Sequence, residues 1–277
     1  MRLVTGAMLF LWLVCAHAEP RPQWELGAGA TAFTLPDYRG SDERRGYLYP
    51  LPYLVYRGDK LRVDRQGFRG IFFESDRVQL DFSVYGTPPV DSSRNEARQG
   101  MPDLDPTLEI GPLITVNLER NRAAGRQLDL RLPARAVIAT DFSHASRAGW
   151  VFNPALALNL RPQFGGGRWN VGFNTGPIFA TSRYHAYYYG VDSQFATPQR
   201  PAYTARGGYS GWMALASLSR RFDKLWVGGF ARYDLLNGAA FEDSPLVRRH
   251  ASWMAGFGIA WILAESQRKV DVAEPYY

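Results

Sequence analysis

Cysteine and long apolar runs are nearly absent from this sequence. Cys15 is the only cysteine among 277 residues, which excludes a disulfide framework and a zinc–thiolate site. Beyond the N-terminal segment, no uncharged run is longer than residues 251–264. That length is below the ~20 apolar residues that a membrane-spanning helix needs, so insertion into a membrane by helices is excluded as well.

The N-terminal segment reads as an export signal. Arg2 gives it a positive start, and residues 3–14 are uncharged and mostly apolar. Ala16-His17-Ala18 then forms the small-x-small pattern at which such signals are cleaved. We therefore expect residues 1–18 to be a signal peptide that is removed when the protein is exported through the periplasm.

Cleavage at this point also removes Cys15 and leaves a mature chain, residues 19–277, without a cysteine nucleophile. A second interpretation is lipid attachment at Cys15. The residue before such a cysteine should be small, and Val14 is not. The remaining length suits one large β-domain of about 250 residues, which barrels commonly fill without splitting.

The composition favours a β-protein at a membrane. Aromatic residues make up 14% of the chain, which also holds 27 glycines and 18 prolines. These residues suit many strands, many turns and aromatic belts at a lipid boundary. The formal net charge of +6 favours anionic surfaces such as lipopolysaccharide phosphates as partners, although a basic protein need not have a specific one.

Alternation of apolar and polar residues is the main structural signal, because a barrel strand shows one face to lipid and the other to the lumen. In residues 126–140, leucines and alanines occupy one face, and Gln127, Asp129, Arg131 and Arg135 occupy the other. We expect an all-β fold, a transmembrane antiparallel up-and-down β-barrel. Its strands are expected at residues 24–34, 46–56, 61–73, 78–85, 108–118, 126–140, 150–161, 169–179, 212–218, 225–233 and 253–263.

This makes eleven segments, whereas a barrel with both termini in the periplasm needs an even number of strands. Gly67 and Gly70 offer a turn or a bulge within residues 61–73. We therefore expect twelve strands, with ten as the alternative. The charged tail after Leu263, which ends in Tyr276-Tyr277, either extends the last strand or lies outside it.

The links between the segments are of two kinds. Short ones at residues 162–168 and 221–224 are expected to be periplasmic turns, and long polar ones at residues 87–106, 181–208 and 235–250 to be extracellular loops. Several tryptophans lie near expected strand ends, as an interfacial girdle requires, or as the core of a soluble sandwich would also place them. They are Trp150, Trp169, Trp226 and Trp253.

Charged residues on the polar faces are the candidate lumen residues. Opposite charges that face each other inside a barrel either line a water path or hold the wall as internal ion pairs, and in about twelve strands the two outcomes are comparable. The candidates are Asp81, Glu109, Asp129, Arg131 and Arg135.

Five short motifs follow one another along nearly the whole mature chain. Their residues are Pro36, Asp37, Tyr38, Gly40, Ser41 and Asp42; Pro50 and Pro52; Tyr189 and Gly190; Pro201, Tyr203, Gly207 and Gly208; and Asp243, Ser244 and Pro245. In this order the motifs resemble those of the MipA/OmpV family. They also suit turns, because Asp and Ser bond turn amides and Gly accepts positive φ. Pro50 and Pro52 cannot donate to a ladder, so one side of their strand should be unpaired or bulged.

The resemblance implies a barrel of the Gram-negative outer membrane that associates with the lytic transglycosylase MltA and a peptidoglycan synthase. Other members are described as osmoregulated porins or solute-uptake proteins. The resemblance therefore leaves two functions open: a scaffold for murein-remodelling enzymes, or a narrow porin for small solutes. It implies no catalytic residue and no cofactor.

A third and more distant hypothesis is an esterase at the outer rim, which needs a serine, a histidine and an acid close together. Asp141, His144 and Ser146 are the best candidates, although residues this near along a turn rarely converge on one nucleophile. His185 lies among tyrosines that stack sugars or merely line the rim. Three histidines in three loops offer no metal-ligand spacing, and an exported protein is an implausible partner for nucleic acid.

Overall fold

The computed structural model describes residues 20–64, 67–121, 123–141 and 143–271. The expected signal peptide, residues 1–18, and the terminal Tyr276-Tyr277 lie outside the described residues. Within the described part, no helix is long and apolar enough to cross a membrane.

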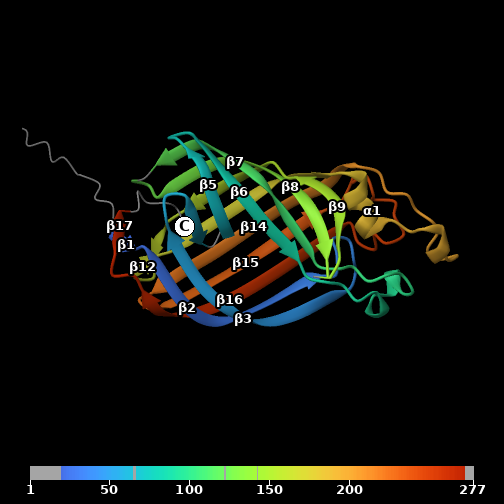
Figure 1. Cartoon of the computed structure of the whole chain (residues 1–277), viewed down its shortest axis with the longest axis horizontal. Coiled ribbons are helices and arrows are strands. Elements are labelled where there is room, and N and C mark those ends of the chain that lie inside the picture. Colours follow the sequence, from blue (N-terminus) through green and yellow to red (C-terminus); the bar gives the residue numbers. More distant parts are fainter. Residues whose placement is uncertain (1–19, 65–66, 122, 142, 272–277) are drawn as a thin grey trace, which may run out of the picture.

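The chain is almost entirely β-structure (Figure 1). The strands of the main sheet are β2 (Trp24–Pro36), β3 (Arg44–Arg57), β4 (Leu61–Asp64), β5 (Gly67–Glu74), β6 (Val78–Thr87), β7 (Thr107–Asn121), β8 (Arg126–Thr140), β9 (Ala145–Phe152), β10 (Ala155–Leu160), β13 (Asn170–Ala180), β14 (Gly208–Phe222), β15 (Leu225–Leu235) and β16 (Ala251–Glu265). The small elements are β1 (Pro20–Pro22), β11 (Gln163–Phe164), β12 (Gly167–Arg168), β17 (Lys269–Asp271), α1 (Ser182–Tyr189) and the 3-10 turns η1 (Ser92–Arg94), η2 (Glu96–Arg98) and η3 (Ser193–Phe195).

The main sheet closes on itself into a barrel of twelve antiparallel wall strands. β9 and β10 share one place in the wall, because both pair with β8 on one side and with β13 on the other. The strand is interrupted between them at Asn153-Pro154. The expected segment 61–73 divides into β4 and β5, which pair with each other. The prediction of twelve strands is therefore confirmed, and the alternative of ten is wrong.

Alternation places large apolar side chains on the outside of the wall. On β16, Trp253, Phe257 and Trp261 are 49%, 56% and 53% exposed, whereas Ala260 and Ile262, on either side of Trp261, are 0% and 4% exposed. Most strands pair on both sides, which satisfies most backbone hydrogen bonds within the wall, so such an outer face suits hydrocarbon. The predicted transmembrane barrel with an apolar outer face is confirmed, whereas its inner face mixes polar and apolar side chains.

The two ends of the barrel differ. Short turns lie at one end, here called the turn end, on the left in Figure 1. There the last strand continues two residues past Leu263, to Glu265, and residues 269–271 of the tail form β17, which pairs with β1 at the beginning of the described chain. Long connections and α1 lie at the other end, the loop end, on the right in Figure 1.

Trp226 does not belong to an interfacial girdle, so that expectation is wrong for this residue. Its ring lies in the lumen, where a Cβ on Gly228 would meet it at 2.5 Å. Gly256 makes room for the inward ring of Phe230 in the same way, at 2.6 Å. Because glycines on β15 and β16 lack a side chain, they leave room for two inward aromatic rings. Trp150 and Trp253 lie on the outside, as expected.

Candidate functional site: the lumen and its loop cap

The loop end of the barrel is closed by packed loops, here called the loop cap: residues 37–43, 88–106, 181–207 and 236–250. Their core contains Tyr38, Val90, Leu104, Tyr188, Tyr189, Val191, Leu236, Phe241 and Leu246. Tyr189 and Phe241 stack with ring centroids 3.7 Å apart, and both are almost fully buried. The long connections are therefore not independent surface loops but one packed unit with its own hydrophobic core.

Side chains of α1 extend this core across the mouth of the barrel. It follows β13, yet the hydroxyl of Tyr187 donates to the carbonyl of Asp105, 2.9 Å away, in the β6–β7 connection. The hydroxyl of Tyr188 lies 3.4 Å from the hydroxyls of Thr87 and Thr107 at the ends of β6 and β7. β7, β8 and the β9/β10 strand separate β13 from β6 in the wall, so these contacts bridge the opening.

The motif residues from separate loops meet inside the cap. The hydroxyl of Tyr38 donates to the carbonyl of Leu246 at 2.9 Å, and that of Tyr189 donates to the carbonyl of Arg39 at 2.9 Å. Ser244 donates to the carbonyl of Tyr189 at 2.7 Å. Three motifs that lie far apart in the sequence thus become one hydrogen-bonded assembly, which supports a conformational role for them.

The other motif residues lie around the same assembly. Gly40 has a φ of 94°, and its carbonyl accepts from the backbone N–H groups of residues 248 and 249, at 2.8 and 3.0 Å. Tyr203 forms a bridge with Val191. Gly190 ends α1, and Gly207 lies so near the N-terminus of α1 that a Cβ would meet the Ser182 nitrogen at 2.7 Å. Pro36 is buried at the end of β2. Asp42, Pro201, Asp243 and Pro245 stand in the loops that form the cap, and Gly208 begins β14.

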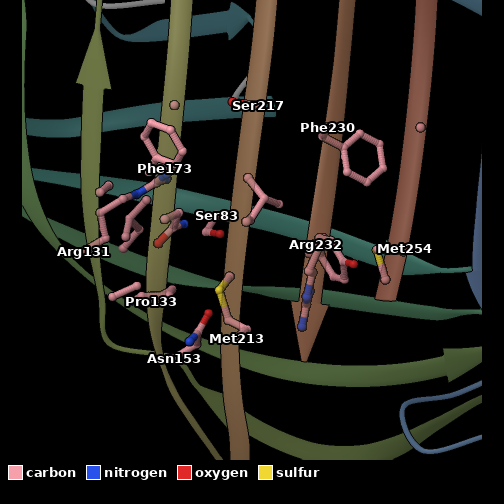
Figure 2. Close-up of a pocket in the computed structure, with 18 of the residues that line it drawn as sticks. Ser83, Arg131, Pro133, Asn153, Phe173, Met213, Ser217, Phe230, Arg232 and Met254 are labelled. Carbon is pink, nitrogen blue, oxygen red and sulfur yellow. The ribbon is translucent and has the colours of Figure 1, made fainter. Parts of the chain in front are cut away.

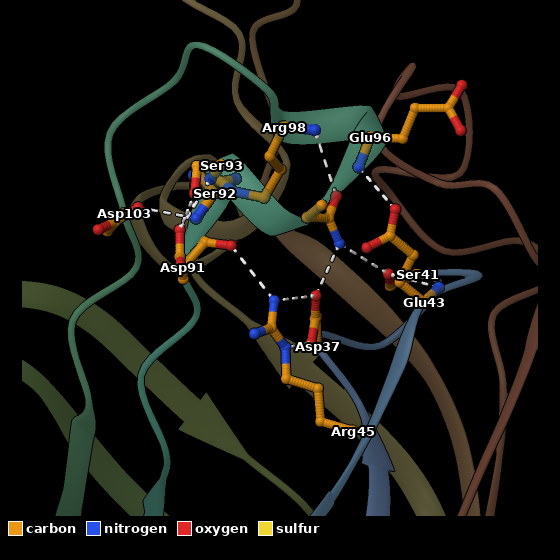
Figure 3. Close-up of polar contacts among 11 residues, drawn as sticks. Asp37, Ser41, Glu43, Arg45, Asp91, Ser92, Ser93, Glu96, Arg98 and Asp103 are labelled. Carbon is orange, nitrogen blue, oxygen red and sulfur yellow. Dashed lines mark hydrogen bonds and ion pairs between the residues drawn. The ribbon is translucent and has the colours of Figure 1, made fainter.

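A polar network fastens the β6–β7 connection to the β2–β3 loop (Figure 3). Arg45 donates to Asp37 at 2.7 Å. Asn95, which is fully buried, donates to Asp37 at 2.9 Å and to Ser41 at 3.2 Å. The backbone N–H of Glu96 donates to the Glu43 carboxylate at 2.6 Å. Sequence reasoning did not find Asn95, because no pattern in a long polar loop marks which of its amides becomes buried.

His185 is part of the cap core and not of a sugar-stacking surface. Its Nδ1 lies 2.5 Å from the carbonyl of Arg206 and therefore carries the proton that it donates there. The side chain is fully buried against Tyr189 and Phe241, and burial lowers the pKa of the imidazole below its usual value. A buried neutral imidazole suits a structural role.

The candidate triad does not assemble. His144 is exposed, and its Nδ1 lies 3.0 Å from the Ser143 hydroxyl and 3.9 Å from the Asp141 carboxylate. A relay needs the acid and the nucleophile on opposite ring nitrogens, whereas here both groups face the same one. Ser146 instead lies in β9, opposite Ala139. Among the described residues, no cluster suited to hold a metal ion is found.

Below the cap, the lumen contains a cavity of about 830 Å³. Figure 2 shows part of its wall, with Arg131 and Pro133 from β8, Met213 and Ser217 from β14, and Phe230 and Arg232 from β15. The lining mixes arginines and amides with aromatic and apolar side chains. A volume of this size lies in the range of small-molecule sites, which are about 300–1,000 Å³.

The structure places the lumen candidates as follows. Glu109, Asp129, Arg131 and Arg135 line the cavity. Arg135 donates to Glu109 at 2.9 Å, and Asp129 accepts from Gln127 at 2.7 and 2.8 Å. Asp81 lies on the inward face of β6, where it is 1% exposed and accepts from Gln79 at 2.8 Å. These carboxylates are paired, which favours internal locking of the wall over a row of unpaired channel charges.

Two further ion clusters were missed by the sequence reasoning. Glu25 is fully buried near the turn end and binds Arg57 at 2.8 Å and Arg221 at 2.7 Å. Near the loop end, Asp234 binds Arg232 at 2.7 Å and Arg39 at 3.0 Å. Both acids stand on the inward face of their strands, so a strict reading of alternation in β2 and β15 would have found them.

Comparison with known proteins gives one family and several distant structures. A family model described as "MltA-interacting protein MipA" matches residues 28–263. Comparison with curated proteins finds no match. The similar solved structures include a bacterial polysaccharide outer membrane secretin, at 8% identity over 87% of this chain and 99% of that chain, with a TM-score of 0.35. OprB of Pseudomonas putida, in a high-pH structure, shows 9% identity over 86% and 94%, with a TM-score of 0.36.

A FadL homologue of Pseudomonas aeruginosa is similar at the same level, with 8% identity over 88% of this chain and 91% of that chain and a TM-score of 0.33. Likenesses this distant carry no argument about function. The family match and the geometry of the lumen and the cap are what bear on function.

Proposed function

Because the chain belongs to the MltA-interacting protein MipA family, we propose that it is an outer-membrane scaffold that holds a murein-remodelling enzyme, rather than a general porin. The partner we propose is a lytic transglycosylase, together with a peptidoglycan synthase. The Gram-negative outer membrane is the proposed location, after export through the periplasm, with the loop end outside and the turn end facing the periplasm.

The closed loop cap is the observation that carries this proposal. A general porin needs a water path from one end to the other. Here Tyr189, Phe241 and Leu246 are buried across the mouth, and the lumen carboxylates are paired. A barrel that is plugged and internally locked is suited to present surfaces.

The turn end offers the surface that a periplasmic partner reaches. Phe164 stacks on Trp169 with ring centroids 5.2 Å apart, and Phe222 meets Trp169 edge-on at 6.3 Å. Arg220 lies over the Phe222 ring at 4.3 Å. Phe164 and Phe222 are about half exposed, at 51% and 42%. Exposed aromatic rings beside an arginine are typical of protein interfaces.

Photo-crosslinking from the two ends tests the scaffold. Benzoylphenylalanine replaces Gln163 in β11 at the turn end, or Gln194 in η3 of the loop cap; both glutamines are exposed. We expect Gln163, and not Gln194, to give an adduct with a murein hydrolase or synthase. Adducts from Gln194 alone, or from neither position in correctly inserted protein, would contradict the scaffold.

A narrow uptake channel for small solutes is the second candidate, and the 830 Å³ cavity is the observation that favours it. Planar bilayers test it directly. Reproducible conductance steps that change with Arg135→Glu, which reverses the charge beside Glu109, would favour the channel. A silent bilayer together with the Gln163 adduct would favour the scaffold.

The basic loop end supports lipopolysaccharide as a further partner. The Arg44 guanidinium lies 3.6 Å from the centroid of the outward Trp253 ring, where an interfacial cation is expected. Arg248 and Arg249 follow in the β15–β16 connection, and both are outside the buried core. Phosphate groups of the outer leaflet would meet these side chains.

A further inference from the structure

The barrel wall has a gap beside β3. Over residues 44–56, β3 pairs with β2 without interruption. On its other side, among the described residues, it pairs only through Tyr56 and Arg57, which meet β4. β4 and β5 are short, and β5 lies only in the left part of the wall in Figure 1. Most of the second edge of β3 therefore has no strand beside it.

β6 forms the opposite border of this gap. Its residues 79–81 pair with β5, whereas residues 82–87 pair only with β7 in the described part of the chain. The region between residues 44–55 of β3 and residues 82–87 of β6 is called the wall gap below. Six residues of strand correspond to about 20 Å along the strand.

Inward-facing rings at both borders of the wall gap are partly exposed, and at its loop end the gap is spanned by Arg45, which donates to the carbonyl of Asp91. Tyr49 lies opposite Thr31 and Tyr85 opposite Glu109, and both of these partners line the cavity. Directly opposed residues share a face, so both tyrosines point inward. They are nevertheless 47% and 42% exposed. The cavity itself reaches the two borders, at Leu51 and Tyr53 on β3 and at Ser83 and Tyr85 on β6.

The sequence keeps the β3 border from accepting another strand. Pro50 and Pro52 lie inside the continuous ladder with β2, opposite Ala30 and Ala28. Proline fits such a ladder only where its missing N–H faces the unpaired side. Two successive donors are therefore absent from the free edge, which disfavours strand addition by a partner. The unpaired side that the two prolines predicted is confirmed.

The side chains at the borders of the wall gap indicate which class of molecule could pass through it. Outward apolar side chains flank the gap, with Leu48 74% exposed and Phe72 71% exposed. Just inside, the Arg135 guanidinium lies 5.9 Å from the Tyr85 ring centroid and pairs with Glu109. An apolar border that leads to a charged pair matches a molecule with an apolar chain and one polar end. The loop cap closes the other route from the loop end.

We propose that the wall gap is a lateral opening through which a single-chain amphiphile, of the fatty-acid class, moves between the hydrocarbon of the bilayer and the lumen. Its polar end meets Arg135, and its chain lies against Leu51, Tyr53 and Phe230. This role is independent of the murein scaffold, but it requires that the barrel be embedded in a membrane.

Quenching of a bimane label by a lipid-dissolved nitroxide tests the opening. Ser217→Cys places the label on the lumen face of β14, across the barrel from the gap, and Ala216→Cys places it on the outer face one residue away. Both are made with Cys15→Ser, which leaves a single thiol. The purified protein is reconstituted in phosphatidylcholine vesicles that contain stearic acid with a doxyl group near the chain end.

We expect the doxyl group to quench both labels. Ser83→Phe, on the inward side of β6 at the gap, should abolish quenching at Ser217 and leave quenching at Ala216 unchanged; Ser83→Leu serves if the larger ring prevents folding. A water-soluble nitroxide should still quench Ser217 in either variant, through the turn end. Unquenched Ser217 beside quenched Ala216, or quenching that persists in both Ser83 variants, overturns the opening.

Failure of the membrane barrel itself gives a different result, because Ala216 would then remain unquenched by the lipid-dissolved probe. The experiment therefore separates a closed wall from a protein that is not in the bilayer.

Discussion

Removal of one buried ring from the loop cap should open the barrel to ions. In the Phe241→Ala variant, the cap loses the stack on Tyr189, 3.7 Å away, and the edge contact with His185, 4.6 Å away. Phe241 is 0% exposed, so its replacement leaves a cavity inside the cap core. The ring lies outside the wall ladders, and the barrel itself should therefore stay folded.

The size of the effect follows from burial. A fully buried Phe→Ala change costs about 3–5 kcal/mol, because transfer and cavity terms add. The cap is a local unit whose opening does not require the strands to separate. A loss of about 4 kcal/mol shifts its closed–open equilibrium by roughly a thousandfold, since about 1.4 kcal/mol corresponds to each factor of ten.

Single-channel recording in planar bilayers measures this shift. We expect long open events from Phe241→Ala and rare, brief events from the unaltered protein. Phe257→Ala is the matched control, because Phe257 faces outward and is 56% exposed, so its removal leaves the cap intact. Equal open probability in Phe241→Ala and in the unaltered protein, at confirmed insertion, would refute the idea that the cap core seals the barrel.

Three further predictions concern the buried polar groups. Glu25→Gln should lower the free energy of unfolding by about 3 kcal/mol, because two arginines lose the buried carboxylate that they bind. Unfolding with urea in detergent measures this loss. Glu265→Gln is the control and should change the free energy little, since the Glu265 side chain beside Arg221 is 49% exposed. Burial lowers the pKa of His185, so the opened cap binds more protons than the closed cap. The cap should therefore become more sensitive to protease as the pH falls below 6.5. The His185→Gln variant should not show this dependence on pH. Asn95→Leu should destabilise the cap by about 2 kcal/mol, since it removes two buried side-chain hydrogen bonds, and faster cleavage within residues 88–106 would show it.

The wall of the barrel could be predicted from the sequence because its signal is local. Alternation in residues 126–140 gives both the strand and its lumen face, and Gly67 within a long segment marks the division into β4 and β5. Pro50 and Pro52 likewise predicted an unpaired side, since the missing donor is a property of the residue itself.

The loop cap could not be predicted in this way. Its contacts join residues such as Tyr38 and Leu246, which are 208 positions apart, and no periodicity links them. The inward position of Trp226 was missed for a related reason. Its face is decided by space that Gly228 and Gly258 leave beside it, and sequence alone does not show which glycine lies beside which ring.

Thiol labelling of intact cells tests the capped barrel most directly. Single cysteines replace Gln194 on the cap surface and Ser217 in the lumen, and a maleimide that does not cross the outer membrane is added from outside. The account predicts rapid labelling at Gln194 and no labelling at Ser217 until the membrane is permeabilised. Labelling of Ser217 as fast as Gln194 in intact cells would contradict it.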